Sequence, residues 1–423
     1  MSGLPMKVFK FGGASVKDAA GVRNVATVVK RHAQDDLLIV VSAMGKTTNA
    51  LEEVVRACRE GADAKPLIAA LRATHEAALR EVAPDDGHAA TALADAFDAL
   101  MRYVGRAMEG PADRNYDHIV SFGEVWSTII VAAHLNAAAL PSHWLDAREV
   151  VATDGLHRAA RMDWERSAAN AQKVLKPLLT GQPARVVTQG FIGRSTEGYD
   201  TTLGREGSDF SAAIFAYLLD AESVTIWKDV AGMYNADPKK FADTKLLEHI
   251  SYKEAIELSY FGASVIHPRT LQPLQQKSIP LYVRSFVDPE ATGSTIDHQS
   301  ANDSLIPSFI HKPGQVLISI TPRDLSFVVE ENLSGIFAAF ARHGVHINLM
   351  QNSAVAFTVC VDNSHRVKPL VLELRGEYEV RWNEDCELIT VRHFDEATVK
   401  KLLQGKEPLI EQRSRNTARF VVK

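Results

Sequence analysis

Lys10-Phe11-Gly12-Gly13-Ala14-Ser15-Val16, near the N-terminus, joins a cation, two adjacent glycines and a hydroxyl. The apolar residues Val8 and Phe9 precede it, and a helical pattern follows it to about Lys30. A strand, a glycine turn and a helix in this order present backbone N–H groups to phosphate, and a lysine adds positive charge. An ordinary turn, in which glycine only supplies a positive φ, explains the same residues. The heptad alone leaves both interpretations open.

The overall composition is that of a globular protein with more than one domain. A chain of 423 residues is too long for a single hydrophobic core, so two or three domains are expected. Its contents of 46% apolar and 23% charged residues are ordinary. A formal net charge of -5 argues against nucleic acid or an anionic membrane as a partner.

The cysteines and the N-terminus indicate a cytoplasmic location. Cys58, Cys360 and Cys386 are few, far apart and without metal-ligand spacing, which favours a reducing compartment and no metal site. The N-terminus lacks a signal-peptide pattern. No apolar run approaches the roughly 20 residues that span a bilayer. We therefore expect a soluble protein without a membrane partner.

Strand and helix patterns alternate through the first 300 residues. The expected strands are 37–42, 185–188 and 223–227, with a strand-like stretch at 118–122. The expected helices are 50–108, broken near 84–87, then 127–136 and 208–219. This alternation predicts an α/β fold with a largely parallel sheet.

The pattern changes after a polar connector at about 297–314. Strands at 316–320, 346–349, 354–361 and 378–382 and helices at 334–342 and 366–374 give the order βαββαβ, a small ferredoxin-like unit. A shorter copy follows, with strands at 388–393, 408–412 and 418–422 and a helix at 396–403. The sequence therefore predicts a second, α+β region.

Two segments offer polar groups for a small substrate. Gly45-Lys46-Thr47 is not a P-loop, because the required earlier glycine is Val40. Ser42 and Thr48 instead follow a buried strand, where open α/β sheets bind ligands, although loop chemistry or an N-cap explains them equally well. Glu124 suits a substrate ammonium or, more simply, an acidic residue at a helix start.

Three later segments concentrate charged and aromatic residues. Residues 201–209 contain Arg205 and Asp209 together with two glycines and Ser208. We favour an anion site at a helix start, because a plain capped loop would explain the glycines and Ser208 but not the charged residues. Residues 227–238 carry an aromatic and two carboxylates suited to a nucleotide, or form a surface turn. His267, before Pro268, is more often structural than catalytic.

In combination, these motifs resemble the aspartate kinases of the amino-acid kinase family. The motifs are Lys-Phe-Gly-Gly-x-Ser-Val, Gly-Glu, Leu-Gly-Arg-x-Gly-Ser-Asp, Trp-x-Asp-Val-x-Gly-x-Tyr-x-x-Asp-Pro and Phe-Gly-Ala-x-Val-x-His-Pro, in this order. The resemblance implies an α/β amino-acid-kinase-like parallel-sheet sandwich with a C-terminal ferredoxin-like (ACT) α+β regulatory region. The implied division is 1–297 catalytic, 298–314 linker with a candidate first strand of the second ACT unit at 308–311, 315–385 first ACT unit and 386–423 shortened second unit.

The resemblance implies ATP-dependent phosphorylation of the L-aspartate side chain to 4-phospho-L-aspartate, with Mg²⁺, as the first step toward lysine, threonine and methionine. By resemblance, Lys10 and Asp209 are catalytic: Lys10 contacts the transferring phosphoryl group, and Asp209 orients the Lys10 side chain. The implied aspartate-binding residues are Ser42, Thr48, Glu124, Arg205 and Ser208. The implied ATP-binding residues are Lys10, Gly12, Gly13, Ser15, Lys228, Asp229, Tyr234 and Lys239. An amino-acid feedback effector at the ACT region and a homodimer are also expected.

The sequence departs from the family pattern at several of these places. Ala14 replaces the usual Thr, Glu206 stands where Gly is frequent, and Lys239 stands where Arg is common. Ser264 stands where a nucleotide-contacting Lys is frequent, and Lys228 stands where Thr is frequent. We hypothesise that Lys228 offsets the lost charge.

The tail also departs, since a chain ending at Lys423 leaves no room for the last helix of a second ACT unit. The candidate effector segments are 331–335 and 348–353, and a structural turn and a dimer interface explain them equally well.

Two other functions compete with aspartate phosphorylation. The same chemistry with glutamate or another small acid keeps the enzyme class and changes the acceptor. A catalytically inactive amino-acid sensor would use only the tail, but intact Lys10, Arg205 and Asp209 weigh against it.

Overall fold

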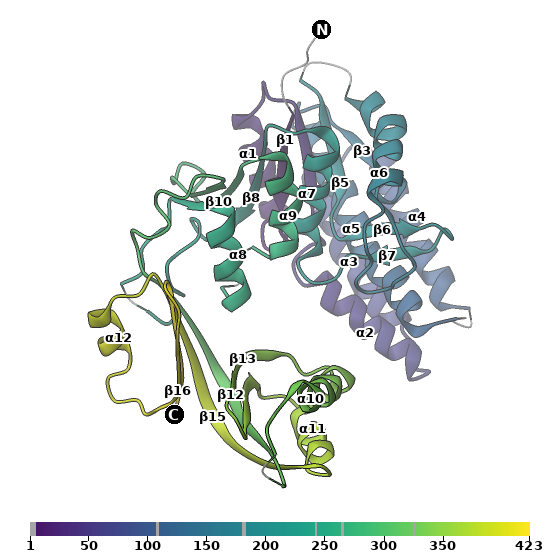
Figure 1. The fold of residues 1–423 in the computed structure, drawn as a ribbon. Helices are drawn as coiled ribbons and strands as arrows, with labels where there is room; N and C mark the ends of the chain where they lie inside the picture. Colours follow the sequence, from purple (N-terminus) through teal and green to yellow (C-terminus); the bar gives the residue numbers. More distant parts are fainter. Residues whose placement is uncertain (1–5, 107–109, 180–182, 242, 264–265, 325) are drawn as a thin grey trace. The chain divides into compact units, whose positions relative to one another are not determined.

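The structure, a computed structural model, describes residues 6–106, 110–179, 183–241, 243–263, 266–324 and 326–423 (Figure 1). These residues form two compact units. The first consists of the described residues within Met1–Met233, Leu246–Ile256 and Val265–Ser300. The second consists of those within Tyr234–Lys245, Glu257–Ser264 and Ala301–Lys423.

The first unit is built on a sheet whose described strands run in the order β3-β5-β2-β1-β8-β10-β11-β9. Its central strands are parallel neighbours, and only β10 and β11 pair antiparallel. β2 (Leu37–Val41) is buried at every position, as expected of a parallel strand covered on both faces. The strands are β1 (Lys7–Phe11), β3 (His143–Leu145), β5 (Arg185–Gln189), β8 (Ser223–Lys228), β9 (His249–Ser251), β10 (Leu281–Ser285) and β11 (Ser294–Asp297).

Helices pack on this sheet from several parts of the chain. α7 (Gly207–Leu219) packs against β1, β2 and β8, and α5 (Ala112–Ala137) against β2, β3 and β5. α2 (Thr47–Arg59), α3 (Lys65–Val82) and α4 (Gly87–Val104) pack against α5. The predicted parallel α/β fold is confirmed, with a second break in the helical region at residues 60–64.

The remaining elements of this unit are shorter or flank the sheet. A small sheet joins β4 (Ala152–Thr153), β6 (Ile192–Ser195) and β7 (Asp200–Thr202). The other helices are α1 (Ala19–Arg31), α6 (Trp164–Asn170), α8 (Tyr252–Phe261) and α9 (Pro268–Lys277).

The prediction of a strand-like stretch at 118–122 followed by a separate helix at 127–136 was wrong. Both segments belong to α5, and Glu124 lies in its middle rather than at a helix start. Ile119, Val120 and Phe122 suggest a strand, but burial of α5 around most of its circumference favours apolar residues at every position. Tertiary packing, not local periodicity, decides this element.

α5 also bears on the expectation about apolar segments. Among the described residues it is the one helix long and apolar enough to cross a bilayer by length and composition. The expectation that no apolar run approaches that length was therefore wrong for α5. Its most apolar window is 89% buried, as in the core helix of a globular protein.

The second unit contains an antiparallel sheet with the described strands in the order β13-β14-β12-β15-β17-β16. Its elements are β12 (Ser308–Pro322), α10 (Glu330–His343), β13 (Ile347–Asn352), β14 (Phe357–Asp362), α11 (Val367–Leu374), β15 (Tyr378–Arg392), α12 (Glu396–Leu402), β16 (Pro408–Arg413) and β17 (Thr417–Val422). α10 and α11 bury their apolar faces on one side of the sheet, including Ile336 and Leu370. The expected ferredoxin-like α+β region is confirmed.

Two long strands replace what the sequence suggested were four shorter ones. The segments 308–311 and 316–320 are both part of β12, and 378–382 and 388–393 fall within or at the end of β15. Residues 308–312 pair with 388–392, and 315–322 pair with 378–386. The first half of β12 thus takes the place expected of a detached first strand of the second repeat, beside the second half of β15. The expected connector therefore contains a strand.

Candidate active site

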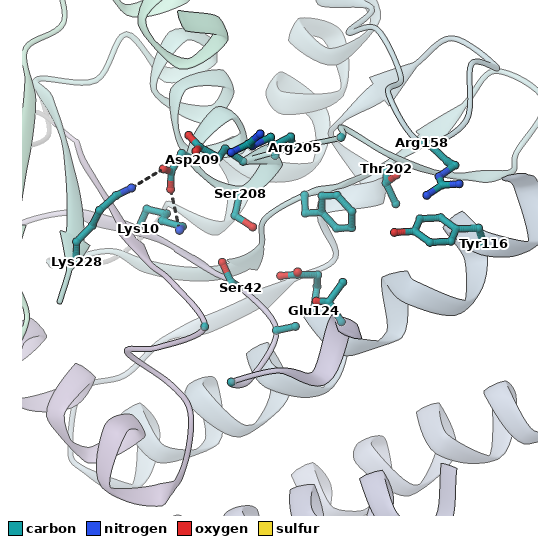
Figure 2. Close-up of a pocket in the computed structure, with 18 residues that line it drawn as sticks. Lys10, Ser42, Tyr116, Glu124, Arg158, Thr202, Arg205, Ser208, Asp209 and Lys228 are labelled. Carbon is teal, nitrogen blue, oxygen red and sulfur yellow. Dashed lines mark ion pairs between the residues drawn. The ribbon is translucent and has the colours of Figure 1, made fainter. Parts of the chain in front are cut away.

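A pocket of about 530 Å³ opens in the first unit at the ends of several sheet strands (Figure 2). The turn after β1, the loop after β2, the middle of α5, the β7–α7 loop and the end of β8 contribute to its lining. Carboxyl ends of parallel strands are where α/β sheets bind ligands. The predicted site residues in its lining are Lys10, Gly13, Ser42, Thr48, Glu124, Arg205, Ser208, Asp209 and Lys228.

At one end of the pocket, Asp209 lies between two lysines (Figure 2). Lys10 Nζ is 2.7 Å from Asp209 Oδ1, and Lys228 Nζ is 3.4 Å from Oδ2. Burial alone would raise the pKa of Asp209, but the charges of Lys10 and Lys228 outweigh it and lower the pKa. Two ammonium groups around one ionised carboxylate leave one positive charge, which suits phosphate oxygens.

The turn after β1 needs a glycine at position 13 because its backbone lies close to the loop after β2. A Cβ on Gly13 would lie 2.8 Å from the carbonyl oxygen of Ala43 and 2.9 Å from that of Gly45. The Gly45 N–H donates to the Gly13 carbonyl at 3.0 Å, which ties the turn to the loop after β2. Neither Gly12 nor Gly13 is among the described residues with positive φ. The explanation by backbone angle alone was therefore wrong.

Glu124 reaches the pocket from the middle of α5. It is 3% exposed, and its Oε2 has no hydrogen-bond partner among the described residues. Burial raises its pKa to about 8, opposed by the Ala43 N–H and by Lys10. A buried carboxyl oxygen without a partner is costly, so a ligand that carries an ammonium is its natural complement.

The loop that starts α7 brings Arg205, Glu206 and Ser208 to the same pocket. Arg205 is exposed at the pocket, and Ser208 lies in the first turn of α7. The positive end of the α7 helix dipole favours an anion there. Glu206 has φ +54°, and its Oε2 is buried without a partner among the described residues. The left-handed backbone explains why glycine is frequent at this position.

Replacing Glu206 with Gly should raise the free energy of unfolding by about 1 kcal/mol. Left-handed backbone costs a non-glycine residue about 1 kcal/mol or more, and a buried unpaired carboxylate oxygen adds to that, which outweighs the flexibility of glycine in the unfolded chain. Urea unfolding measures the change. Glu206→Ala, which keeps the strained backbone, is the matched control, and equal stability of the two variants would show that the backbone is not the cause.

Some predicted site residues lie outside the lining of this pocket. Gly12 and Ser15 are in the turn after β1, where the Ser15 Oγ is buried. Asp229 follows β8 and is exposed. Tyr234 and Lys239 belong to the second unit, and Ser264 lies outside the described residues. His267 caps α9, its Nδ1 accepting from the Arg269 N–H at 3.2 Å, which is a structural contact.

The pocket is also lined by residues that were not among the predicted site residues: Tyr116, Arg158, Phe191, Thr202 and Glu206. Tyr116 lies about two turns before Glu124 on α5, a relation visible only once this segment is read as one helix. Phe191 follows the carboxyl end of β5. Because ligands bind at the carboxyl ends of parallel strands, the predicted strand at 185–188 could have indicated this residue. For Arg158, in an irregular loop, the sequence offers no comparable signal.

Comparisons with known proteins agree with this geometry. Residues 5–285 match the model of the amino acid kinase family. Lysine-sensitive aspartokinase 3 of Escherichia coli is 31% identical over 362 residues, which cover 84% of this chain and 78% of the relative. The crystal structure of E. coli aspartokinase III with aspartate and ADP aligns with TM-score 0.82 at 28% identity, covering 99% of this chain and 96% of that one.

A plant relative is longer than this chain. The bifunctional aspartokinase/homoserine dehydrogenase 2 of Zea mays is 32% identical over 377 residues. These cover 84% of this chain and only 39% of the relative. The chain thus spans about two fifths of the length of the first relatives it matches.

A parallel sheet that presents a lysine-bearing glycine turn beside a buried aspartate has the geometry of a phosphate-binding site. The family match covers most of the first unit, and the aspartokinase matches extend into the second. The chain therefore belongs to the amino acid kinase family, in its aspartokinase branch.

Proposed function

We propose that the protein transfers the γ-phosphoryl group of ATP to the side-chain carboxylate of L-aspartate, giving ADP and 4-phospho-L-aspartate. The observation that carries this proposal is one pocket with the Lys10–Asp209–Lys228 group at one end and the unpartnered Glu124 oxygen farther along it (Figure 2). The first group suits a phosphoryl group, and the second suits an α-ammonium.

The residues support a mechanism without a general base. The aspartate β-carboxylate is ionised at neutral pH, so it attacks the γ-phosphorus directly. Catalysis then depends on positioning and on neutralising negative charge. Lys10 contacts the transferring group, Asp209 orients Lys10, Arg205 and Ser208 bind a substrate carboxylate, and Glu124 binds the ammonium. Ser42 and Thr48 complete the acceptor site.

For the nucleotide, we assign Gly12, Gly13 and Ser15 to the phosphates, with Lys228 and Asp229 around the remainder. Tyr234 and Lys239, which belong to the second unit, stay predictions from the sequence. Mg²⁺ is proposed as an ion carried by the nucleotide. Among the described residues no group of three or more His, Cys, Asp or Glu side chains is placed to hold a metal, and both Asp209 oxygens already face lysines. This donor set fits an ion held mainly by phosphate oxygens and water.

Regulation and assembly are proposed at the second unit. One aligned structure is E. coli aspartokinase III with lysine and aspartate in its T-state, with TM-score 0.83 at 27% identity. We propose that an amino acid, lysine first among the candidates, binds near 331–335 and 348–353. The edge strand β13 carries exposed Met350, and exposed Phe337 on α10 belongs to the same unit, which supports a homodimer there. Free Cys58, Cys360 and Cys386 support a cytoplasmic location.

An acyl-phosphate trapping assay tests the proposed reaction. With ATP, Mg²⁺ and hydroxylamine, L-aspartate should yield a hydroxamate, and L-glutamate should yield far less. Turnover with glutamate in preference to aspartate would assign another acceptor to the same chemistry. Without a hydroxamate from either acid, the proposal fails. The assay repeated with lysine, threonine and methionine identifies the effector.

A further inference from the structure

The pocket carries a second arginine that the family motifs do not include. Arg158 enters from the loop between β4 and α6 and lies with Tyr116 and Thr202 at the end away from Lys10, Asp209 and Lys228 (Figure 2). We propose that Arg158 is a second acceptor-binding residue, which Asp117 positions to receive a carboxylate of a dicarboxylic amino acid. This inference rests on the proposed function and deepens its acceptor site.

The backbone of Arg158 is held in an unfavourable conformation by a buried carboxylate. Its φ is +65°, a conformation that costs a non-glycine residue free energy. The Arg158 N–H donates to both oxygens of Asp117, at 3.1 and 3.0 Å, and Asp117 is fully buried. Strain that a dedicated buried partner maintains is typical of residues placed for binding.

Asp117 also holds a second segment of the pocket lining, at the end of β7. The Thr202 N–H and Oγ1 donate to it at 3.1 and 2.6 Å, and His157 Nδ1 lies 3.0 Å from its Oδ2. Thr202 ends β7, three residues before Arg205. Asp117 therefore holds both of the segments that carry the two arginines. It lies on α5, seven residues before Glu124.

The guanidinium of Arg158 is fixed as a flat surface. It lies over the Tyr116 ring at 4.1 Å and has an ion pair with Asp113 at 3.5 Å, in which both side chains are about half exposed. The Tyr116 hydroxyl donates to Glu52 at 2.7 Å, which fixes the ring. A guanidinium stacked by its face keeps its N–H edge for a carboxylate, so little side-chain entropy is lost on binding.

The charges of the acceptor end call for this second cation. Glu124 and Glu206 bring two carboxyl groups, and Arg205 brings one positive charge. Arg158, whose ion pair with Asp113 is about half exposed, adds a second guanidinium beside the pocket. Two guanidiniums and the Glu124 carboxyl then match two carboxylates and an ammonium.

Arg158→Met tests the inference, because it keeps the side-chain volume and the backbone hydrogen bonds to Asp117. We expect the KM for aspartate to rise about tenfold or more, as for loss of a charged hydrogen bond, with the KM for ATP and the melting temperature nearly unchanged. Arg161→Met is the matched control, since Arg161 is exposed on the same loop and does not line the pocket. Succinate, which has two carboxylates and no ammonium, should weaken as a competitive inhibitor in the same proportion.

Asp117→Asn tests the positioning role, because an amide would place a donor against backbone N–H groups. It should raise the KM for aspartate more than it lowers kcat, and should raise the inhibition constant of succinate. An Arg158→Met protein with native KM, or an equal rise in Arg161→Met, overturns the inference even if Asp117→Asn does not fold. Failure of the native protein to phosphorylate aspartate would instead count against the proposed function, and the Arg158 comparison is then made with glutamate.

Discussion

Replacing Lys10 with Met should lower kcat on the order of a thousandfold while the protein stays folded. Lys10 is 8% exposed, and its ammonium lies 2.7 Å from Asp209 at the phosphate end of the pocket. In a reaction without a general base, the protein lowers the barrier mainly by stabilising the negative charge on the transferring phosphoryl group. The fold survives because Asp209 keeps Lys228 as a partner, so no buried carboxylate is left alone.

Steady-state kinetics and thermal unfolding together check this result. Lys7→Met is the matched control, because Lys7 lies on the same strand and pairs with the partly exposed Asp35 at 3.0 Å. It should leave kcat within about twofold, as expected of a surface ion pair. Near-native turnover by Lys10→Met would remove the central role of Lys10.

Lys228→Thr distinguishes the two lysines. If Lys228 offsets the cation missing at Ser264, its loss should raise the KM for ATP, and Lys10 should retain part of the rate. An unchanged KM for ATP would contradict this hypothesis. The two ammoniums would then have separate roles, with Lys228 serving only to hold Asp209.

Several of the predicted site residues that line the pocket lie in local motifs. Lys10 and Gly13 share one strand-turn segment, and Arg205 and Asp209 share one loop and helix start, so each pair is a matter of short-range spacing. The βαββαβ order of the tail was likewise visible from local periodicity. Such features depend on residues close in sequence and are readable without tertiary contacts.

What the sequence did not reveal depends on long-range contacts. Glu124 was assigned to a helix start because burial around most of α5 hides the helical periodicity of its sequence. Arg158 has its position from Asp117 and Tyr116, some 40 residues away in the chain. β12 and β15 are each one continuous strand because they pair with one another along most of their length, between residues more than 55 positions apart in the chain. None of these relations leaves a local pattern.

The affinity for aspartate should increase with pH up to about pH 9, because only ionised Glu124 attracts an ammonium. Burial raises the pKa of Glu124 to about 8, so at pH 7 about one tenth of the empty sites carry the charge. Since apparent affinity scales with the competent fraction, the KM at pH 7 should be about ten times that at pH 9. A KM independent of pH over this range would contradict the assigned role.

Glu124→Gln supplies the decisive comparison. It should raise the KM for aspartate at pH 9 about a hundredfold, by loss of a buried charge partner, and abolish the pH dependence. Glu149→Gln, an exposed glutamate outside the pocket, should keep both the native KM and its pH dependence. Inhibition by succinate, which lacks the ammonium, should not weaken in Glu124→Gln.

The same carboxyl should be visible in the stability of the empty protein. Its folded pKa of about 8 lies above the usual 4.5, so its contribution to stability is fully present below pH 4.5. That contribution is lost as the pH rises toward 8, because the unfolded chain releases the proton more readily. Melting temperatures of the native protein should therefore fall over this range relative to those of Glu124→Gln. Saturating aspartate should reduce the difference, because the bound ammonium then pairs with the ionised carboxylate that burial otherwise penalises.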